Sequence, residues 1–404
     1  MTEPNPPRPK VGLVLPGGGA RAAYQAGVLQ AISELLPPDS PSPFPIVSGT
    51  SAGAINATLI AAHALHFRRG TQELAGVWEH IRSELVFRTD GGTMLKNLMY
   101  WLMGLLHAGF ARRNVIALLD NTPLRRLLER HIIFARLQEA IDAGALDALS
   151  LTCSGYTSAR AVCFYKGKPG LKAWHRTRRI GQPAELRLDH VMASVALPVI
   201  FPAVRLGREY YGDGSLRQMA PLSPAVHLGA DRILVIGVRN EQANKLPEEG
   251  EEVPYPSLGQ VAGYLMDVVF SDSLYADLER LQRINNSMRE LAAASGRSPS
   301  LKVIDTLVIV PSEDMREIAQ RHVREFPRSV RVLLRMLGGN RKSGSQLASY
   351  LLFESGFCTE LVELGRKDAF AHADKLLSFL GAAHPVADKK QVISDSGVPP
   401  PHDG

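Results

Sequence analysis

A serine flanked by small residues is the first place in this sequence where covalent chemistry can be expected. Gly49-Thr50-Ser51-Ala52-Gly53 forms a G-x-S-x-G pattern between an apolar run and a helix-like segment. Small neighbours allow a tight turn between a strand and a helix, and such a turn projects the serine hydroxyl outward. Ser51 would also lie near the positive end of the helix dipole, which favours developing negative charge. The pattern predicts a nucleophile, and a plain turn rich in serine and glycine is the alternative.

A second glycine-rich corner lies earlier in the chain, at Pro16-Gly17-Gly18-Gly19-Ala20-Arg21. Three residues without side chains expose consecutive backbone N–H groups to an anion. Such donors suit an oxyanion hole, and Arg21 would add a fixed positive charge. The same residues match the G-x-G-x-x-A pattern of a dinucleotide loop. A dinucleotide site requires an acidic residue at the end of the next strand, where this chain has Ser48-Gly49-Thr50-Ser51, so we favour the oxyanion hole.

A serine nucleophile needs a group that accepts its proton, and Asp213 is the candidate. It stands in Tyr210-Tyr211-Gly212-Asp213-Gly214, which alone would be interpreted as a β-turn. None of the twelve histidines lies in a motif that recommends it as a base. His190 and His227 are the nearest candidates in the sequence, and ordinary surface or core positions account for both.

The three motifs and a fourth, Ala193-Ser194-Val195-Ala196-Leu197-Pro198, occur in an order that resembles the patatin-like phospholipases, the bacterial members in particular. The resemblance covers roughly residues 10–240 and implies a lipid acyl hydrolase with a Ser–Asp dyad. It implies an α/β fold of three layers, α/β/α, with a mostly parallel central sheet and additional C-terminal helices. Two positions depart from the family pattern: Ala22 replaces a common glycine, and Ser215 a common glycine or alanine.

The resemblance also implies a role for each motif. Ser51 is the nucleophile, and Asp213 is the general base and later the acid, with Gly214 beside it in the acid motif. The backbone of Gly17, Gly18 and Gly19, with Arg21, forms the oxyanion hole. Gly49, Thr50, Ala52 and Gly53 form the nucleophile elbow. The reaction passes through a covalent acyl-serine and requires no metal and no cofactor. Because a solvated carboxylate is a weak base, we expect burial to raise the pKa of Asp213.

The periodicity of apolar residues predicts an α/β domain. Strands are expected at 10–15, 44–48, 149–153, 161–165, 232–238 and 307–310, with helices at 20–36, 54–65, 264–291, 313–337 and 347–380. We expect a loose lead-in over 1–9, a hydrolytic domain over 10–312 and a helical extension packed on it over 313–381. The motif-bearing core of the domain is 10–240. The last segment, 382–404, is rich in Pro, Asp and Ser and is expected to be a flexible tail.

Composition excludes several classes of protein. The 404 residues are 45% hydrophobic and 21% charged, as in globular proteins, and the net charge of +6 is too small for a dedicated nucleic-acid binder. Three cysteines without Cys/His spacing support neither a disulfide framework nor a zinc site. The N-terminus lacks the apolar core of a secretory signal, and no apolar run is long enough to span a bilayer. We therefore expect a cytoplasmic protein.

Two segments could bring the protein to a lipid surface as a peripheral contact. Residues 94–106 place apolar side chains on one helical face and predict a lid or interfacial helix, with a core helix as the alternative. The lipid-contact candidates there are Leu98, Met99, Trp101, Leu102 and Leu105. Residues 321–337 alternate arginines with apolar residues, for which a solvated surface helix is the favoured interpretation.

The predicted activity is hydrolysis of phospholipids, lysophospholipids or related esters. A transacylase that passes the acyl group to an alcohol would use the same dyad. A non-catalytic lipid-binding or regulatory protein on the same fold is the third alternative, and the intact motifs speak against it. The sequence leaves the oligomeric state open.

Overall fold

The computed structural model describes residues 9–90, 92, 96, 99, 117–240, 255–295, 301–336 and 345–382. The expected lead-in and tail lie almost entirely outside these residues. So do Leu98, Trp101, Leu102 and Leu105 of the lipid-contact segment, whereas Met99 is described and is about half exposed. Among the described residues, no helix is long and apolar enough to cross a membrane.

One sheet of ten strands forms the centre of the described chain. Its strands are β1 (Val11–Leu15), β2 (Ile46–Thr50), β3 (Ala148–Gly155), β4 (Ala161–Gly167), β5 (Trp174–Arg176), β6 (Arg179–Pro183), β7 (Val204–Leu206), β8 (Glu209–Asp213), β9 (Arg232–Ile236) and β10 (Asp305–Ile309). Eight of the strands follow the order β10-β9-β1-β2-β3-β4-β6-β5. The other two, β7 and β8, pair with each other, and β8 also pairs with β3.

The sheet is parallel in one half and mixed in the other. Strands β10, β9, β1, β2 and β3 are parallel to one another, whereas the pairs β3–β4, β3–β8, β5–β6 and β7–β8 are antiparallel. Parallel strands are covered on both faces, and β1 and β2 are buried at every position. The expected parallel sheet is thus confirmed over the half that carries the serine and glycine motifs.

The main helices are α1 (Ala23–Leu35), α2 (Ala52–Ala62), α3 (Phe67–Glu79), α4 (Ser83–Val86), α6 (Thr122–His131), α7 (Ala135–Asp142), α8 (Leu188–Ser194), α9 (Ser223–His227), α10 (Leu258–Asp267), α11 (Ser273–Ser295), α12 (Met315–His322), α13 (Arg328–Met336), α14 (Ser345–Leu351), α15 (Ser355–Ala371) and α16 (Ala373–Leu380). Shorter helical turns are η1 (Gly19–Ala22), η3 (Gly214–Leu216), η5 (Val268–Asp272) and η6 (Val323–Glu325). The helix expected over 313–337 is divided because Phe326, which precedes Pro327, is extended.

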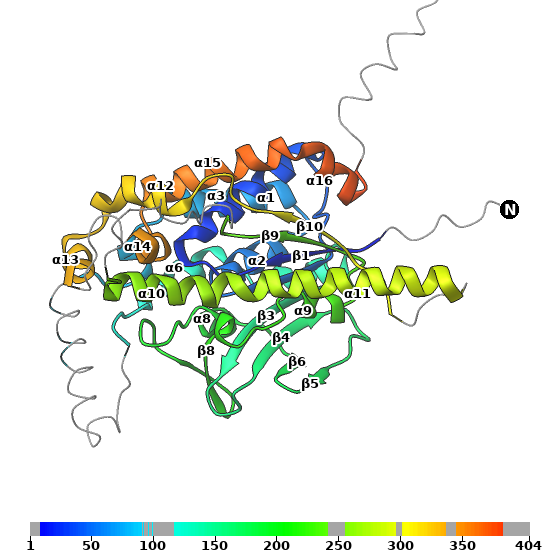
Figure 1. Cartoon of the computed structure of the whole chain (residues 1–404), viewed down its shortest axis with the longest axis horizontal. Helices are drawn as coiled ribbons and strands as arrows, with labels where there is room; N and C mark the ends of the chain where they lie inside the picture. The colour runs from blue at the N-terminus through cyan, green and yellow to red at the C-terminus, as the bar shows by residue number, and fades with distance from the viewer. Residues whose placement is uncertain are drawn as a thin grey trace, which may run out of the picture.

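Helices cover both faces of the sheet, which gives the expected three layers (Figure 1). Alternate strand residues point to opposite faces. Leu13 and Leu15 belong to the larger core, together with residues of α1, α2 and α15. Val14 points to the other face and packs in a second core with Leu222, just before α9, and Leu274 of α11. The C-terminal helix α15 approaches α1 closely, since a Cβ on Gly27 would lie 1.9 Å from the carbonyl oxygen of Val362.

Candidate active site

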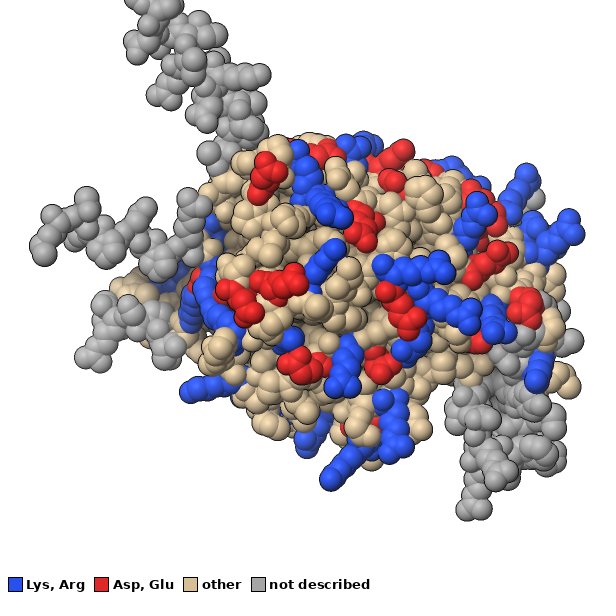
Figure 2. All heavy atoms as spheres, turned by 180° about the vertical axis from the view of Figure 1, so that it is seen from behind, with Lys and Arg blue, Asp and Glu red and all other residues tan. Residues whose placement is uncertain are grey.

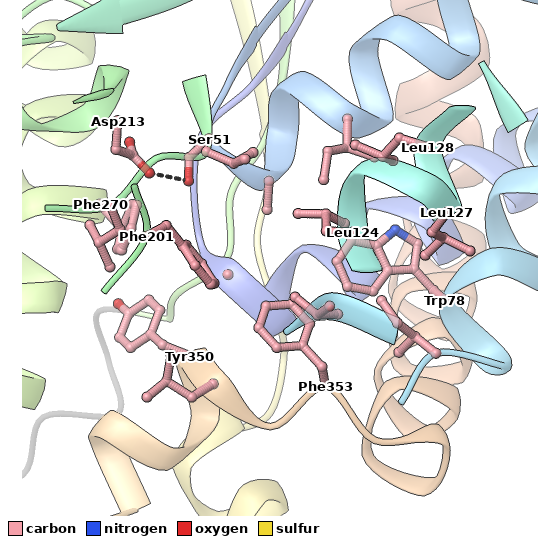
Figure 3. Close-up of a pocket in the computed structure, with 18 of the residues that line it drawn as sticks. Ser51, Trp78, Leu124, Leu127, Leu128, Phe201, Asp213, Phe270, Tyr350 and Phe353 are labelled. Atoms are coloured by element: carbon pink, nitrogen blue, oxygen red, sulfur yellow. Dashed lines mark hydrogen bonds between the residues drawn. The ribbon is translucent and has the colours of Figure 1, made fainter. Parts of the chain in front are cut away.

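Ser51 lies at the corner between β2 and α2, as the motif predicts, and contacts Asp213. Its Oγ donates a hydrogen bond of 2.5 Å to Oδ2 of Asp213 (Figure 3). The backbone of Ser51 has φ 55° and ψ −132°, a conformation that is strained for a residue with a side chain. Ser51 is 5% exposed and Asp213 1% exposed. The hydroxyl and the carboxylate therefore form a buried pair at a strained turn.

The register of the sheet explains why two residues so far apart in sequence meet. Strand β2 lies along β3 up to the pair Thr50–Thr152, and β8 continues along β3 from the pair Cys153–Asp213. Strand β4 occupies the other edge of β3 over this length, so β2 and β8 share one edge. Because β8 runs antiparallel to β3 and β2 runs parallel to it, their C-terminal ends face each other. Ser51 and Asp213 stand at these two ends.

The Ala193–Pro198 motif holds the backbone of both residues. Ser194 Oγ accepts a hydrogen bond of 3.0 Å from the Ser51 N–H and donates one of 2.7 Å to the carbonyl oxygen of Thr152. The carbonyl oxygen of Ala196 accepts a hydrogen bond of 2.8 Å from the Asp213 N–H. Sequence reasoning used this motif only for the resemblance and missed its role in fixing the pair. The presence of the motif in the sequence was the feature from which this role could have been inferred.

Burial gives Asp213 the properties of a base. It raises the pKa of the carboxyl to about 6, against opposing hydrogen bonds from Ser51 and Ser215. The Ser215 N–H donates to Oδ1 at 2.9 Å, which leaves Oδ2 to Ser51. A carboxylate with this pKa is ionised at neutral pH and is a stronger base than a solvated aspartate.

The glycine loop lies beside the serine because α2 packs tightly on the end of β1. A Cβ on Gly53 would lie 2.1 Å from the carbonyl oxygen of Leu15, so only glycine permits this approach. Gly19, with φ 54°, lines the same pocket as Ser51 and Asp213. Within the described chain, no hydrogen bond is recorded from the backbone N–H of Gly17 or Gly18. Gly19 is thus the residue of the loop that lies at the pocket of Ser51.

The guanidinium of Arg21 is held by residues of the C-terminal third. It does not line the pocket at Ser51, and it is buried against the C-terminal helices. It forms an ion pair of 3.3 Å with Asp267, donates to Ser349 Oγ at 2.7 and 2.9 Å, and lies 3.8 Å over the ring of Tyr350. Because Asp267 offsets its charge, these contacts favour a role in joining the glycine loop to α10 and α14.

The histidines that sequence reasoning set aside lie elsewhere. His190 packs on Phe164, its Nδ1 accepts from the Arg187 N–H, and burial lowers its pKa. His227 stacks on Trp174 with ring centroids 4.8 Å apart. Neither lines the pocket at Ser51. In the described ranges, no three His, Cys, Asp or Glu side chains come together as metal ligands.

Comparison with known families adds an independent observation. The family profile described as patatin-like phospholipase matches residues 13–226. The chain belongs to the patatin-like phospholipase family. Membership supports lipid hydrolase activity, with a lipid ester as the class of substrate.

Two solved structures share low sequence identity with the patatin-like chain. It is 14% identical to VipD from Legionella pneumophila, with a TM-score of 0.33 over 96% of this chain and 80% of VipD. It is 14% identical to full-length ExoU from the type III secretion system of Pseudomonas aeruginosa, solved with SpcU, with a TM-score of 0.26 over 95% of this chain and 78% of the other. These scores are too low to carry an argument. No curated protein matches the chain.

An apolar pocket opens from the dyad of this patatin-like protein. Its empty volume, including the open mouth, is about 740 Å³. Figure 3 shows Ser51 and Asp213 on one side of it and the side chains of Trp78, Leu127 and Leu128 on the other. The C-terminal third contributes five lining residues, for which the sequence carried no motif signal: Met266, Phe270, Tyr350, Leu351 and Phe353.

Proposed function

We propose that this protein hydrolyses carboxylic esters of phospholipids, lysophospholipids or related lipids through a Ser51–Asp213 dyad. The observation that carries the proposal is the 2.5 Å hydrogen bond between Ser51 Oγ and Asp213 Oδ2 at one side of an apolar pocket. An acyl chain is the part of a lipid that such a pocket suits, because its lining buries methylene groups. The ester carbonyl would then lie at the serine.

The reaction follows from the positions of these groups. Asp213 accepts the hydroxyl proton while Ser51 Oγ forms a bond to the carbonyl carbon. Backbone N–H groups of Gly17, Gly18 and Gly19 stabilise the negative carbonyl oxygen of the tetrahedral intermediate. The intermediate collapses, the ester C–O bond breaks, and the departing alcohol takes the proton from Asp213. Water repeats the sequence on the acyl-serine and releases the fatty acid.

Fatty-acid release by purified wild type, Ser51→Ala and Asp213→Asn tests the proposal. The substrates are phosphatidylcholine, lysophosphatidylcholine and the soluble ester p-nitrophenyl butyrate. We expect both variants to lose about 10³-fold or more in turnover on every substrate that the wild type cleaves. Ser150→Ala is the matched control, because Ser150 is a buried serine of the same sheet that hydrogen-bonds Ser48 instead of the dyad.

The thermal unfolding midpoint shows whether each variant is folded. A folded Ser51→Ala variant with the activity of wild type would refute the nucleophile, and a folded Asp213→Asn variant with full activity would refute the base. Adding glycerol or another alcohol as acceptor separates hydrolysis from acyl transfer. Release of free fatty acid as the main product supports the hydrolase.

A further inference from the structure

Helix α10 presents a row of apolar side chains to solvent. Leu258, Val261, Leu265 and Val268 in the following turn are 71%, 44%, 53% and 38% exposed. Their spacing of three or four residues places them along one face. Tyr264, beside this row, is 63% exposed, and Tyr255, just before the helix, is 96% exposed. We call these six residues the α10 stripe.

None of the six residues of the stripe is charged, and the first exposed charge after it is Asp272, which forms an ion pair with Arg239. Between residues 255 and 271 the one charged residue is Asp267, which is 4% exposed and paired with Arg21. The next helix, α11, runs on across the same face of the molecule in Figure 1 and carries charges of both signs, such as Glu279, Arg283 and Glu290. Figure 2 shows the opposite face, where basic and acidic side chains are mixed. An exposed helix without charge is therefore unusual on this protein.

The buried side of the same helix reaches the candidate active site. Gly263 packs on α14, since a Cβ there would lie 2.8 Å from the side chain of Gln346. Met266, the neighbour of Leu265, lines the pocket at Ser51, and so does Phe270 in the turn after α10. One helix thus has residues in the pocket and an apolar row facing outward.

We propose that the α10 stripe docks the protein on the surface of a phospholipid bilayer. The inference rests on the proposed function, since a lipid ester must pass from a bilayer to Ser51. The leucines and valines would enter the acyl boundary, and the two tyrosines would lie at the level of the head groups. Six side chains are far fewer than the roughly 20 to 30 residues a side of a stable protein interface, so a lipid surface fits better than a second protein.

The absence of charge in the stripe makes the proposal specific. Docking driven by apolar burial requires no anionic lipid, whereas docking through arginines depends on it. Vesicles of pure phosphatidylcholine are therefore the decisive probe. They also separate the stripe from the arginines of 321–337, of which Arg321 forms an ion pair with Glu360.

Flotation of the full chain with phosphatidylcholine vesicles tests the docking. All variants carry Ser51→Ala, so binding is measured without hydrolysis of the vesicles. We expect Val261→Glu/Leu265→Glu to lower the partition coefficient at least tenfold, because two apolar contacts are replaced by charges. Ile284→Glu/Leu291→Glu is the matched control on α11, where the replaced residues are 39% and 51% exposed, and we expect a change of less than twofold.

A folding defect or the loss of a protein partner could also lower vesicle binding by the stripe variant, and two further measurements distinguish these causes. With Ser51 intact, the stripe variant is expected to hydrolyse p-nitrophenyl butyrate at the wild-type rate, which shows that it is folded. Light scattering is expected to give the same mass for the wild type and the stripe variant. A mass that is halved by the variant would assign the stripe to a second copy of the chain and overturn the proposal.

The remaining outcomes separate docking from the proposed function. Wild type that binds only anionic vesicles, or a stripe variant that binds phosphatidylcholine like wild type, overturns the docking surface. Cleavage of the soluble ester without any vesicle binding overturns docking and leaves the dyad intact. Vesicle binding that depends on the stripe in a protein that cleaves no ester supports docking and overturns the proposed function.

Discussion

The region that matches the family, residues 13–226, and the C-terminal third differ in how they build the site. In the first region the reacting groups stand at strand ends within short motifs, and backbone geometry aims them. In the second region no motif is visible, yet its helices close the site. The carbonyl oxygen of Tyr350 lies against Gly19, and Phe270 and Phe353 form part of the pocket wall. The first region thus holds the candidate reacting groups and most of the pocket wall, and the C-terminal third completes that wall.

Arg21 forms one of the contacts between the two regions, in addition to the close packing of α15 on α1. This residue belongs to the glycine loop, and its buried partners Asp267, Ser349 and Tyr350 all belong to the C-terminal third. A buried arginine requires a counter-charge, because transfer of an unpaired charge from water costs several kcal/mol. The position of the loop is therefore coupled to α10 through this ion pair and to α14 through the hydrogen bonds of Arg21 with Ser349 and Tyr350.

Of the predictions for the two regions, removal of the negative charge of Asp267, which pairs with Arg21, should have the largest effect. Asp267→Asn keeps an oxygen that can accept from Tyr350 but leaves Arg21 buried without a negative partner. We expect the free energy of unfolding to fall by about 3 to 5 kcal/mol, measured by urea denaturation. The double variant Arg21→Met/Asp267→Asn should recover part of this loss, since no buried charge is then unpaired.

The same double variant decides what Arg21 does in the reaction. Loss of an oxyanion-hole donor costs about 10²- to 10³-fold in kcat. If Arg21 joins the two regions, kcat of the folded double variant should remain within about tenfold of wild type. A loss of 10²-fold or more, without a further loss of stability, would return Arg21 to the oxyanion hole.

The parts of the fold that could be predicted are those with a strong local pattern. Strands β1 and β9 are nearly continuous apolar runs because both of their faces are buried, and each lies within an expected strand. Strand β2 begins two residues later than the expected strand and ends in the polar residues Ser48-Gly49-Thr50. Strands β5 and β6 were missed because they are short and largely polar, and β5 is the edge strand at this end of the sheet. In their case neither alternation nor an apolar run distinguishes a strand from a loop.

The candidate site also contains residues that could be predicted from the sequence and residues that could not. Ser51 and Asp213 stand in motifs, so their types and neighbours indicated them, and the structure places their oxygens 2.5 Å apart. The partner of Arg21 is 246 positions away in sequence and carries no signal of its own. The same holds for the pocket wall, where single apolar residues such as Met266 and Phe353 become important only through tertiary packing.

The pKa of Asp213 predicts the pH dependence of the reacting region. Because burial raises this pKa to about 6, and the base must be ionised, kcat/KM on a soluble ester should fall about tenfold per pH unit below 6. Asp213 contributes in the opposite direction to stability. The folded state binds the proton more tightly than the unfolded state, so stability from this group is present at low pH and is lost as pH rises through about 6.

Asp213→Asn separates this effect from general acid denaturation. At pH 8 the variant should be more stable than wild type by about 1 to 3 kcal/mol, because it has no buried carboxylate to ionise. The difference should disappear below about pH 4, where the carboxyl of wild type is protonated in both states. A kcat/KM profile that is flat between pH 5 and 8 would contradict the role of Asp213 as the base.

The smallest effect is expected for variants at the side of the pocket away from the dyad, where the two regions meet, and it concerns the preference for acyl-chain length. Trp78 of α3 stacks on Phe353, with ring centroids 6.4 Å apart (Figure 3). Its Nε1 donates a hydrogen bond of 2.9 Å to Oδ1 of Asn56. If an acyl chain ends against this pair, Trp78→Ala should extend the pocket. We expect the ratio of kcat/KM for long over short p-nitrophenyl esters to rise about tenfold, since a few methylene groups gain contacts.

Two variants make the test of this wall specific. Phe353→Ala opens it from the C-terminal third and should shift the chain-length ratio in the same direction as Trp78→Ala. Trp78→Phe keeps an aromatic ring on Phe353 and loses only the hydrogen bond to Asn56, so it should leave the ratio within about twofold of wild type. If Trp78→Ala lowers activity equally on all chain lengths, the pair is a structural contact between the regions and does not measure the acyl chain. A shift from Trp78→Ala but not from Phe353→Ala would place the end of the chain against α3 alone, and the C-terminal third would then enclose the serine without setting specificity.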